Sequence, residues 1–274
     1  MNKDTSLKRM PVWKWCLLLI GAIFLSIIGY ALIVSFTEVG NYIGYPSMAI
    51  IGSVVVLALY AVFVRLLEGH WPRDLRLWRL IPHTALGLLV GAVFMTLVVS
   101  IIVAIGCASV DWYGSSWQEQ WTAIMLFLGV AVGEEIMDRG VIFRLIDERW
   151  NTTAALIISA LIFGFSHMPN DNATWWSSLA IAIEAGLLLA AAYKWSGSLW
   201  LPIGIHWAWN YVQGNVFGFA VSGNVIGGHI LAPTVDNHDL ITGGAFGPEA
   251  SIIAVILGAF FTLVFLFTRP LHYR

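Results

Sequence analysis

The sequence predicts an all-α polytopic membrane protein, a bundle of about eight transmembrane helices with its N- and C-termini in the cytoplasm. The first observation is composition: the 274 residues are 59% hydrophobic and 11% charged, with a mean hydropathy of +0.80. Soluble domains carry about 25% charged residues. The second is a series of long apolar runs, and the third is the position of every basic residue relative to those runs. Together they predict one integral membrane domain covering residues 1–274.

The apolar runs have the length that a membrane requires. A hydrocarbon core of ~30 Å is crossed by roughly 20 helical residues. The runs cover residues 14–36, 43–67, 82–106, 120–143, 152–168, 174–193, 198–219 and 250–268. The first follows a basic N-terminal segment, as a signal peptide would. Because it is long and lacks a small-residue cleavage site, we interpret it as a span.

The lysines and arginines test this count independently. With the N-terminus inside, the outer segments 37–42, 107–119, 169–173 and 220–249 contain no basic residue. All of the basic residues then lie on the inner side: Lys3, Lys8, Arg9, Lys14, Arg65, Arg73, Arg76, Arg79, Arg139, Arg144, Arg149, Lys194, Arg269 and Arg274. This distribution satisfies the positive-inside rule for eight helices.

The segments between the runs add two expectations. Residues 69–81 combine arginines and tryptophans in the manner of an amphipathic interfacial piece. The outer loop at about 220–249 is rich in glycine and is expected to be partly ordered over the bundle. A net charge of −2 without a basic stripe argues against a nucleic-acid partner. The lipid bilayer is the partner that the composition itself predicts.

The run 120–143 ends in four ionisable groups within "GEEIMDRG". Charged residues inside spanning helices cost at least ~2.5–3.5 kcal/mol each and usually serve a function there. Glu134 and Glu135 are adjacent and point about 100° apart on a helix. Glu135 and Arg139 are spaced i,i+4 and can pair, which leaves Glu134 free to point elsewhere. Asp138 lies i+4 from Glu134, so two like charges share one face.

Two later runs carry histidines at the same helical spacing. Phe163 and His167 are i,i+4 near the end of one run, and His206 and Asn210 are i,i+4 in another. An imidazole and an amide exposed to lipid would lack hydrogen-bond partners, so the second pair is expected to face the bundle interior. A carboxylate beside a histidine can take a proton from water and return it to a leaving amine. A histidine and an asparagine can stabilise an oxyanion.

These residues fall into three ordered motifs: "EEIMDR" (Glu-Glu-x-x-x-Arg), "FGFSH" (Phe-x-x-x-His) and "HWAWN" (His-x-x-x-Asn). In this order and on successive helices, they resemble the CPBP family of intramembrane proteases. That family includes the CAAX prenyl endopeptidases and bacterial proteins linked to bacteriocin immunity. The likeness covers the motif-bearing core at about 120–213, and "GGAFGPE" in the outer loop also looks like bacterial members.

The resemblance implies an eight-helix glutamic endopeptidase that works without a cofactor. Glu134 would be the general base, with His167 as its partner in activating water. His206 and Asn210 would form the oxyanion site. Glu135 and Arg139 would give structural support. This chain has Asp138 where the family usually has an aromatic residue, and Glu184, within "AIAIEAG", is a second candidate carboxylate facing the cavity.

Two alternatives remain open on the residues alone. Glu134, His167 and His206 could hold zinc with an open coordination position, although the chain has no His-Glu-x-x-His motif. The chain could also be a non-catalytic membrane immunity, scaffold or transport protein of the same fold. His206 with Asn210 favours an enzyme, because a proton relay has little use for the asparagine. The resemblance implies a peptide or membrane-protein substrate, prenylated in the CAAX type, and a bacterial cytoplasmic membrane as the location.

Overall fold

The computed structural model describes residues 45–268 together with Pro11 and Gly21. The α-helices are α2 (Tyr45–Glu68), α3 (Leu80–Ala104), α4 (Trp117–Glu135), α5 (Arg144–Arg149), α6 (Thr152–Ser166), α7 (Trp175–Ile181), α8 (Leu188–Ser196), α9 (Trp200–Tyr211), α10 (Asp239–Thr242) and α11 (Ile252–Phe267). Two strands, β1 (Ala108–Trp112) and β2 (Leu231–Val235), complete the regular structure together with short turns of other helix types.

Seven of the eight predicted apolar runs correspond to helices of the structure, and the run 14–36 lies outside the described residues. Within the described part of the chain, four helical segments are long and apolar enough to cross a membrane: Pro46–Glu68, Leu77–Ala104, Trp117–Arg149 and Trp175–Ser196. Two further apolar helices, α6 and α11, are shorter. The protein is therefore a helical membrane protein.

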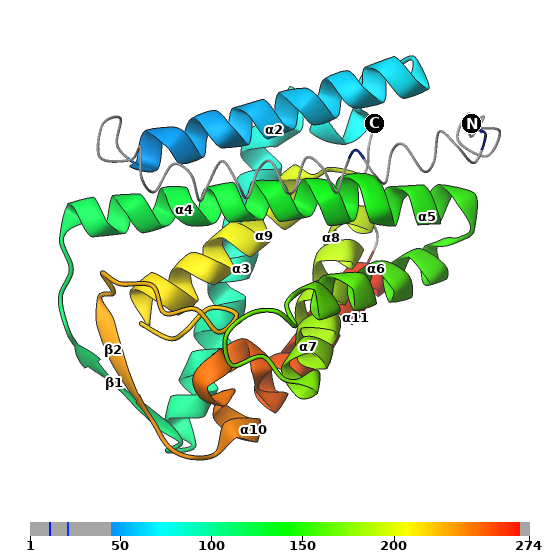
Figure 1. Ribbon diagram of the computed structural model, residues 1–274. Helices are drawn as coiled ribbons and strands as arrows, with labels where there is room; N and C mark the ends of the chain where they lie inside the picture. Colours follow the sequence, from blue (N-terminus) through cyan, green and yellow to red (C-terminus); the bar gives the residue numbers. More distant parts are fainter. Residues whose placement is uncertain (1–10, 12–20, 22–44, 269–274) are drawn as a thin grey trace.

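The helix pair α3 and α9 forms the centre of the bundle, with α2 and α4 lying side by side across one face (Figure 1). Glycines allow the central pair to approach closely. A Cβ atom at Gly91 would lie 2.1 Å from the carbonyl oxygen of Ile205, and one at Gly204 would lie 2.6 Å from that of Thr84. Small residues of this kind let helix backbones approach in membrane proteins. The contact fixes α9, the helix that carries His206 and Asn210.

Three long helices contain a π-helical segment, in which the backbone hydrogen bonds reach one residue further. They are η4 (Ile136–Phe143) between α4 and α5, η5 (Ala182–Leu187) between α7 and α8, and η6 (Val212–Val216) after α9. Such segments often occur at functional sites. Here η4 carries Asp138 and Arg139, and η5 carries Glu184.

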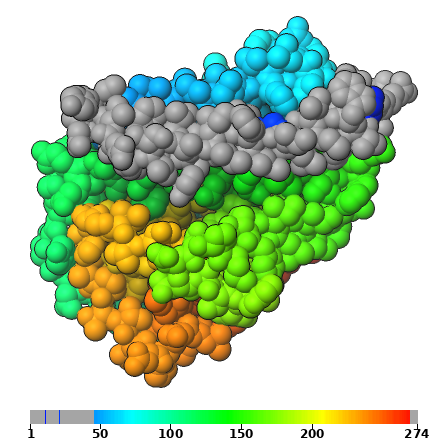
Figure 2. Space-filling model, viewed as in Figure 1, coloured from blue at the N-terminus to red at the C-terminus, as the bar shows by residue number. Residues whose placement is uncertain are grey.

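The outer loop is ordered, as the sequence predicted, and it introduces a small sheet that an all-α chain would not contain. β2 in this loop pairs antiparallel with β1, with Ala108 opposite Val235 and Trp112 opposite Leu231. The rest of the loop folds over the bundle and packs its η8 turn (Pro248–Ala250) against α7. Figure 2 shows the orange residues of this loop gathered on the side of the molecule away from the blue helix α2. The two strands are far apart in the chain, so neither strand alone indicated the pairing.

Exposed tryptophans lie at opposite ends of the long Trp117–Arg149 rod. Trp112 and Trp117 are 78% and 71% exposed where the rod begins, and Trp150 is 64% exposed where it ends. Tryptophan is enriched at both membrane–water boundaries. The segment 69–81 forms two 3₁₀ turns, η2 (Arg73–Leu75) and η3 (Leu77–Arg79). Its Asp74 is buried and accepts hydrogen bonds from the hydroxyls of Tyr60 and Tyr193, both at 2.9 Å.

Candidate active site

A buried ion pair braces the site. Glu135 and Arg139 are 0% and 1% exposed, and Nη1 of Arg139 lies 3.0 Å from Oε1 of Glu135. The other guanidinium nitrogen, Nη2, donates to the carbonyl oxygen of Gly186 at 3.2 Å, and the guanidinium lies 4.4 Å from the centre of the Phe163 ring. The predicted i,i+4 pair is therefore present, and it connects η4 to η5 and to α6.

The same carboxylate orients His206. Nδ1 of His206 lies 2.9 Å from Oε1 of Glu135, the oxygen that also accepts from Arg139. Since an ionised carboxylate can only accept hydrogen bonds, Nδ1 of the ring carries the proton. The opposite nitrogen, Nε2, lies 3.8 Å from Oε2 of Glu134. Glu135 thus sets both the orientation and the tautomer of His206.

His167 is held in a matching way by backbone. It lies at the C-cap of α6, where Nδ1 is 2.8 Å from the carbonyl oxygen of Phe163 one turn earlier. A carbonyl can only accept, so Nδ1 is again the N–H of the ring. Nε2 of His167 lies 3.9 Å from Oε2 of Glu134. The i,i+4 spacing of Phe163 and His167 therefore also allows the carbonyl oxygen of Phe163 to orient the ring of His167.

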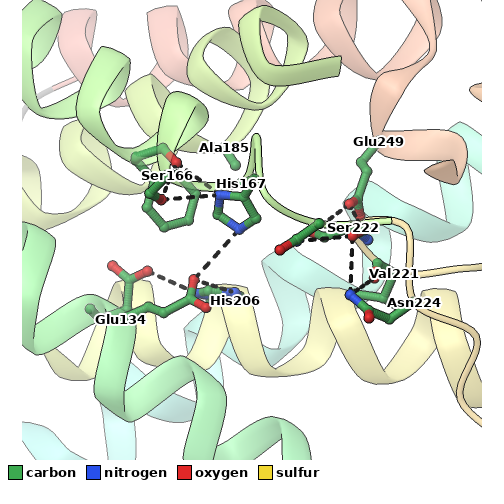
Figure 3. A network of polar contacts seen from close by, with 12 residues as sticks. Glu134, Ser166, His167, Ala185, His206, Val221, Ser222, Asn224 and Glu249 are labelled. Atoms are coloured by element: carbon green, nitrogen blue, oxygen red, sulfur yellow. Dashed lines mark hydrogen bonds and ion pairs between the residues drawn. The ribbon is translucent and has the colours of Figure 1, made fainter. Parts of the chain in front are cut away.

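Glu134 lies where the two imidazoles converge, as the left side of Figure 3 shows. Its side chain is 32% exposed, whereas that of Glu135 is fully buried. The Oε2 atom of Glu134 is buried and has no hydrogen-bond partner among residues 45–268. The adjacent glutamates thus point in different directions, as their helical positions predicted.

A cavity opens beside this constellation. Its lining includes His167, His206, Asn210 and Glu184, and it includes Ser222 and Glu249, which lie across from His167 (Figure 3). The empty space measures about 280 Å³ including its mouth, and it has room for a water molecule. Asn210 is 7% exposed and shares its face of α9 with His206, so both face the bundle interior as predicted. The four motif residues Glu134, His167, His206 and Asn210 are brought together from three helices.

The far wall contains a polar cluster that the sequence analysis did not find. Glu249 is 2% exposed; its Oε1 accepts from the backbone N–H and the hydroxyl of Ser222, and its Oε2 accepts from Nε2 of Gln213 at 2.6 Å. Burial raises the pKa of Glu249 above its ordinary value, although the hydrogen bonds from Ser222 and Gln213 oppose the shift. In the sequence, the one indication of this cluster was Glu249, the single acidic residue of "GGAFGPE".

The other two candidate carboxyls differ in position. Glu184 is 1% exposed and lines the cavity, as predicted. Asp138 is 1% exposed and does not line it; neither of its oxygens has a hydrogen-bond partner in the described part of the chain. Asp138 is nevertheless near enough to interact electrostatically with Glu134, Glu135 and His206.

The zinc alternative requires three ligands around one point. Within the described residues, no group of three or more His, Cys, Asp or Glu side chains is arranged to hold a metal ion. Zinc ligands at about 2.0–2.2 Å in a tetrahedron would lie roughly 3.4 Å from each other. The Glu134 oxygen lies 3.8 and 3.9 Å from the two imidazole nitrogens. The arrangement is thus somewhat wider than a closed zinc site.

The fold and site define a polytopic helical membrane protein with a carboxylate–histidine cluster beside an internal cavity. Residues 116–212 match the family described as type II CAAX prenyl endopeptidase Rce1-like. The match covers the motif-bearing part of the chain and supports its resemblance to the CPBP group of CAAX protease-like proteins. The description of that family is of an endopeptidase, an enzyme that cuts peptide bonds.

The chain is also similar to part of a curated protein that is named as a transporter. The folate transporter FolT of Leuconostoc mesenteroides is 29% identical over 97 residues, which are 35% of this chain and 45% of that protein. The chain therefore spans less than half the length of that relative. No solved structure matches the chain.

Proposed function

We propose that the protein is an intramembrane glutamic endopeptidase in which Glu134 and His167 activate a water molecule. The observation that carries the proposal is the convergence of Nε2 of His206 and Nε2 of His167 on one oxygen of Glu134, at 3.8 and 3.9 Å, where that oxygen has no hydrogen-bond partner within residues 45–268. A water molecule there can hydrogen-bond to Glu134 and to Nε2 of His167 together. Such a water has an acceptor for each of its protons, which is what a hydrolytic nucleophile needs.

The reaction then follows from the positions of the groups. Glu134 takes a proton from water while the oxygen attacks the carbonyl carbon of the substrate. The tetrahedral intermediate carries its negative charge on the former carbonyl oxygen. Glu134 next delivers the proton to the leaving nitrogen as the C–N bond breaks. The products are a carboxylic acid and an amine, and the glutamate is regenerated.

His206 and Asn210 would bind the oxyanion from α9. The amide of Asn210 can donate directly. His206 already donates through Nδ1 to Glu135, so it can donate through Nε2 only as an imidazolium. The buried carboxylate of Glu135 at 2.9 Å provides the countercharge for that cation. This gives Glu135 a positioning role in addition to its pair with Arg139.

Zinc is the second candidate mechanism, and one observation favours it. Each imidazole has its Nδ1 bonded to an oxygen, His206 to a carboxylate and His167 to a carbonyl. Histidine ligands of zinc usually have such partners. Metal analysis of the purified protein separates the two mechanisms: the metal-free proposal predicts full activity without stoichiometric zinc. Loss of activity on chelation, restored by zinc, would replace it.

The topology proposed with this function has eight spans and both termini in the cytoplasm. The exposed tryptophans at both ends of the Trp117–Arg149 rod support two membrane boundaries there. In this orientation His167, at the far end of α6 from Thr152, lies in the outer half of the bilayer. We further propose the bacterial cytoplasmic membrane as its location, and a membrane peptide as its substrate.

The proposal is tested with the full-length protein in detergent and in liposomes. Glu134→Gln and His167→Ala should abolish peptide cleavage, by at least about 10²–10⁴-fold, because general acid–base catalysis is lost. Glu134→Gln should insert and melt like the wild type, since Glu134 makes no hydrogen bond within residues 45–268 that would be lost. His167→Ala should still insert, although it loses the hydrogen bond to the carbonyl oxygen of Phe163. A non-catalytic protein, such as a folate carrier, would show no cleavage even as wild type. Retained cleavage in either variant would refute the assigned roles.

A further inference from the structure

The wall of the cavity contains groups that the proposed chemistry does not use. Glu184 on η5 and Glu249 on η8 are 1% and 2% exposed, and both line the cavity that His167 and His206 also line. Figure 3 shows Glu249 and Ser222 across from His167. A buried carboxyl is expensive unless it is paired or hydrogen-bonded. Two of them on one cavity wall therefore require an explanation.

The two carboxyls differ in the number of hydrogen bonds that they accept. Glu249 accepts three hydrogen bonds, two from Ser222 and one from Gln213, and needs no further partner. Glu184 accepts none from any described residue, and its Oε2 atom is buried without a partner. Its backbone is tightly held, because a Cβ atom at Gly258 of α11 would lie 2.5 Å from the Cα of Glu184. Glu184 is thus an unpaired acceptor fixed in the cavity wall.

Charge is also unbalanced at this wall. No lysine, arginine or histidine nitrogen between residues 45 and 268 lies within ion-pair distance of Glu184 or Glu249. Arg139, a buried cation of the neighbouring site, is already engaged by Glu135 and by backbone carbonyls. A positive group in this wall would have to come from a ligand.

We propose that this wall is a substrate subsite for a cationic side chain, a lysine or arginine beside the bond that is cut. The ammonium or guanidinium would pair with the free oxygen of Glu184, with Glu249 held by Ser222 and Gln213 as the second acidic group. The pairing would also place the backbone of the substrate across His167, His206 and Asn210, which line the same cavity. This inference rests on the proposed function and names the substrate feature that the site selects.

The test uses the full-length protein and two matched peptide libraries. Both contain N-terminally acetylated, C-terminally amidated peptides of the same random sequences. In one library the lysine side chains are free, and in the other they are acetylated, which removes their charge and leaves the sequence unchanged. Mass spectrometry identifies the cut bonds and their relative rates. We expect lysine or arginine to be enriched at one fixed position. Cutting next to lysine should be at least about tenfold slower after acetylation, whereas cutting next to arginine, which keeps its charge, should stay unchanged.

Two variants then test whether Glu184 causes the preference for a cationic side chain. In Glu184→Gln the ratio of rates for free and acetylated lysine should approach one. The control Asp111→Asn removes an exposed acid of β1 outside the cavity and should keep the wild-type ratio. Equal cutting rates next to free and acetylated lysine with wild-type protein would overturn the subsite without any variant, as would an unchanged preference in Glu184→Gln. Those outcomes leave the protease proposal standing. Absence of cleavage by the wild type, matching Glu134→Gln, would instead overturn the proposed function, and the subsite with it.

Discussion

Replacing Arg139 with methionine should destabilise the protein strongly, because it leaves a buried carboxylate without its cation. Glu135 is fully buried, and its Oε1 lies 3.0 Å from Nη1 of Arg139. Removing one partner of a buried ion pair costs about 3–5 kcal/mol. That is a factor of roughly 10² to 10⁴ in the ratio of folded to unfolded protein. The methionine keeps most of the apolar volume, so the loss reports charge rather than a cavity.

The double variant Glu135→Gln/Arg139→Met separates this cause from simple loss of contacts. It removes both charges and keeps an oxygen that can accept from Nδ1 of His206. Most of the lost stability should return, because a neutral replacement of a buried pair is often tolerated. Cleavage should stay low, since His206 would lack the countercharge that lets it donate through Nε2. The measurement is equilibrium denaturation in detergent micelles alongside peptide cleavage.

A matched control is an ion pair at the surface. Nζ of Lys194 lies 2.6 Å from Oδ2 of Asp147, and the lysine side chain is 43% exposed. Lys194→Met should change the free energy of unfolding by less than about 1 kcal/mol. The structural role of the Glu135–Arg139 pair would be refuted if Arg139→Met lost as little free energy of unfolding as this control. It would also be refuted if the double variant were no more stable than Arg139→Met alone.

Two further predictions concern the oxyanion site and the topology. Asn210→Ala should lower kcat by about 10²–10³-fold with little change in KM or melting temperature, because a transition-state donor is lost. A higher KM with unchanged kcat would instead make Asn210 a substrate-binding residue. In a variant without native cysteines, Asp111→Cys should react with a membrane-impermeant maleimide on intact cells, whereas Trp150→Cys should react only after lysis. The reverse pattern would invert the proposed orientation.

The helices were predictable because membrane insertion depends on length and hydropathy, which are local properties of the sequence. The pair of Glu135 with Arg139 was predictable for a similar reason, since helical spacing alone brings the two together. The resemblance to CPBP proteases supplied the roles of Glu134, His167 and Asn210, which spacing could not. Those roles stay predictions until the variants are measured.

The contacts missed from the sequence are made by residues far apart in the chain. Ser222 and Gln213 reach Glu249 only because the outer loop folds back over the bundle. β1 finds its partner in the same loop, so neither short strand carried a sufficient signal by itself. The π-helical segments shift side-chain directions by one residue, which a regular 3.6-residue pattern cannot predict. Glu184 was placed at the cavity by prediction, but its unpaired state emerged only from the packed structure.

His206 connects the two functions of the adjacent glutamates. Its Nδ1 contacts Glu135, which Arg139 holds in place, and its Nε2 faces Glu134, where water would be activated. A change in the charge of Glu135 therefore reaches the reaction through the ring of His206, although Glu135 itself is shielded from the cavity. In the proposed mechanism, stability and catalysis thus depend on the same buried carboxylate through different contacts. Glu135 stabilises the fold through Arg139, whose guanidinium contacts the backbone of η5. It would support the reaction through His206, which would bind the oxyanion. This is why neutralising both members of the pair should restore folding without restoring cleavage.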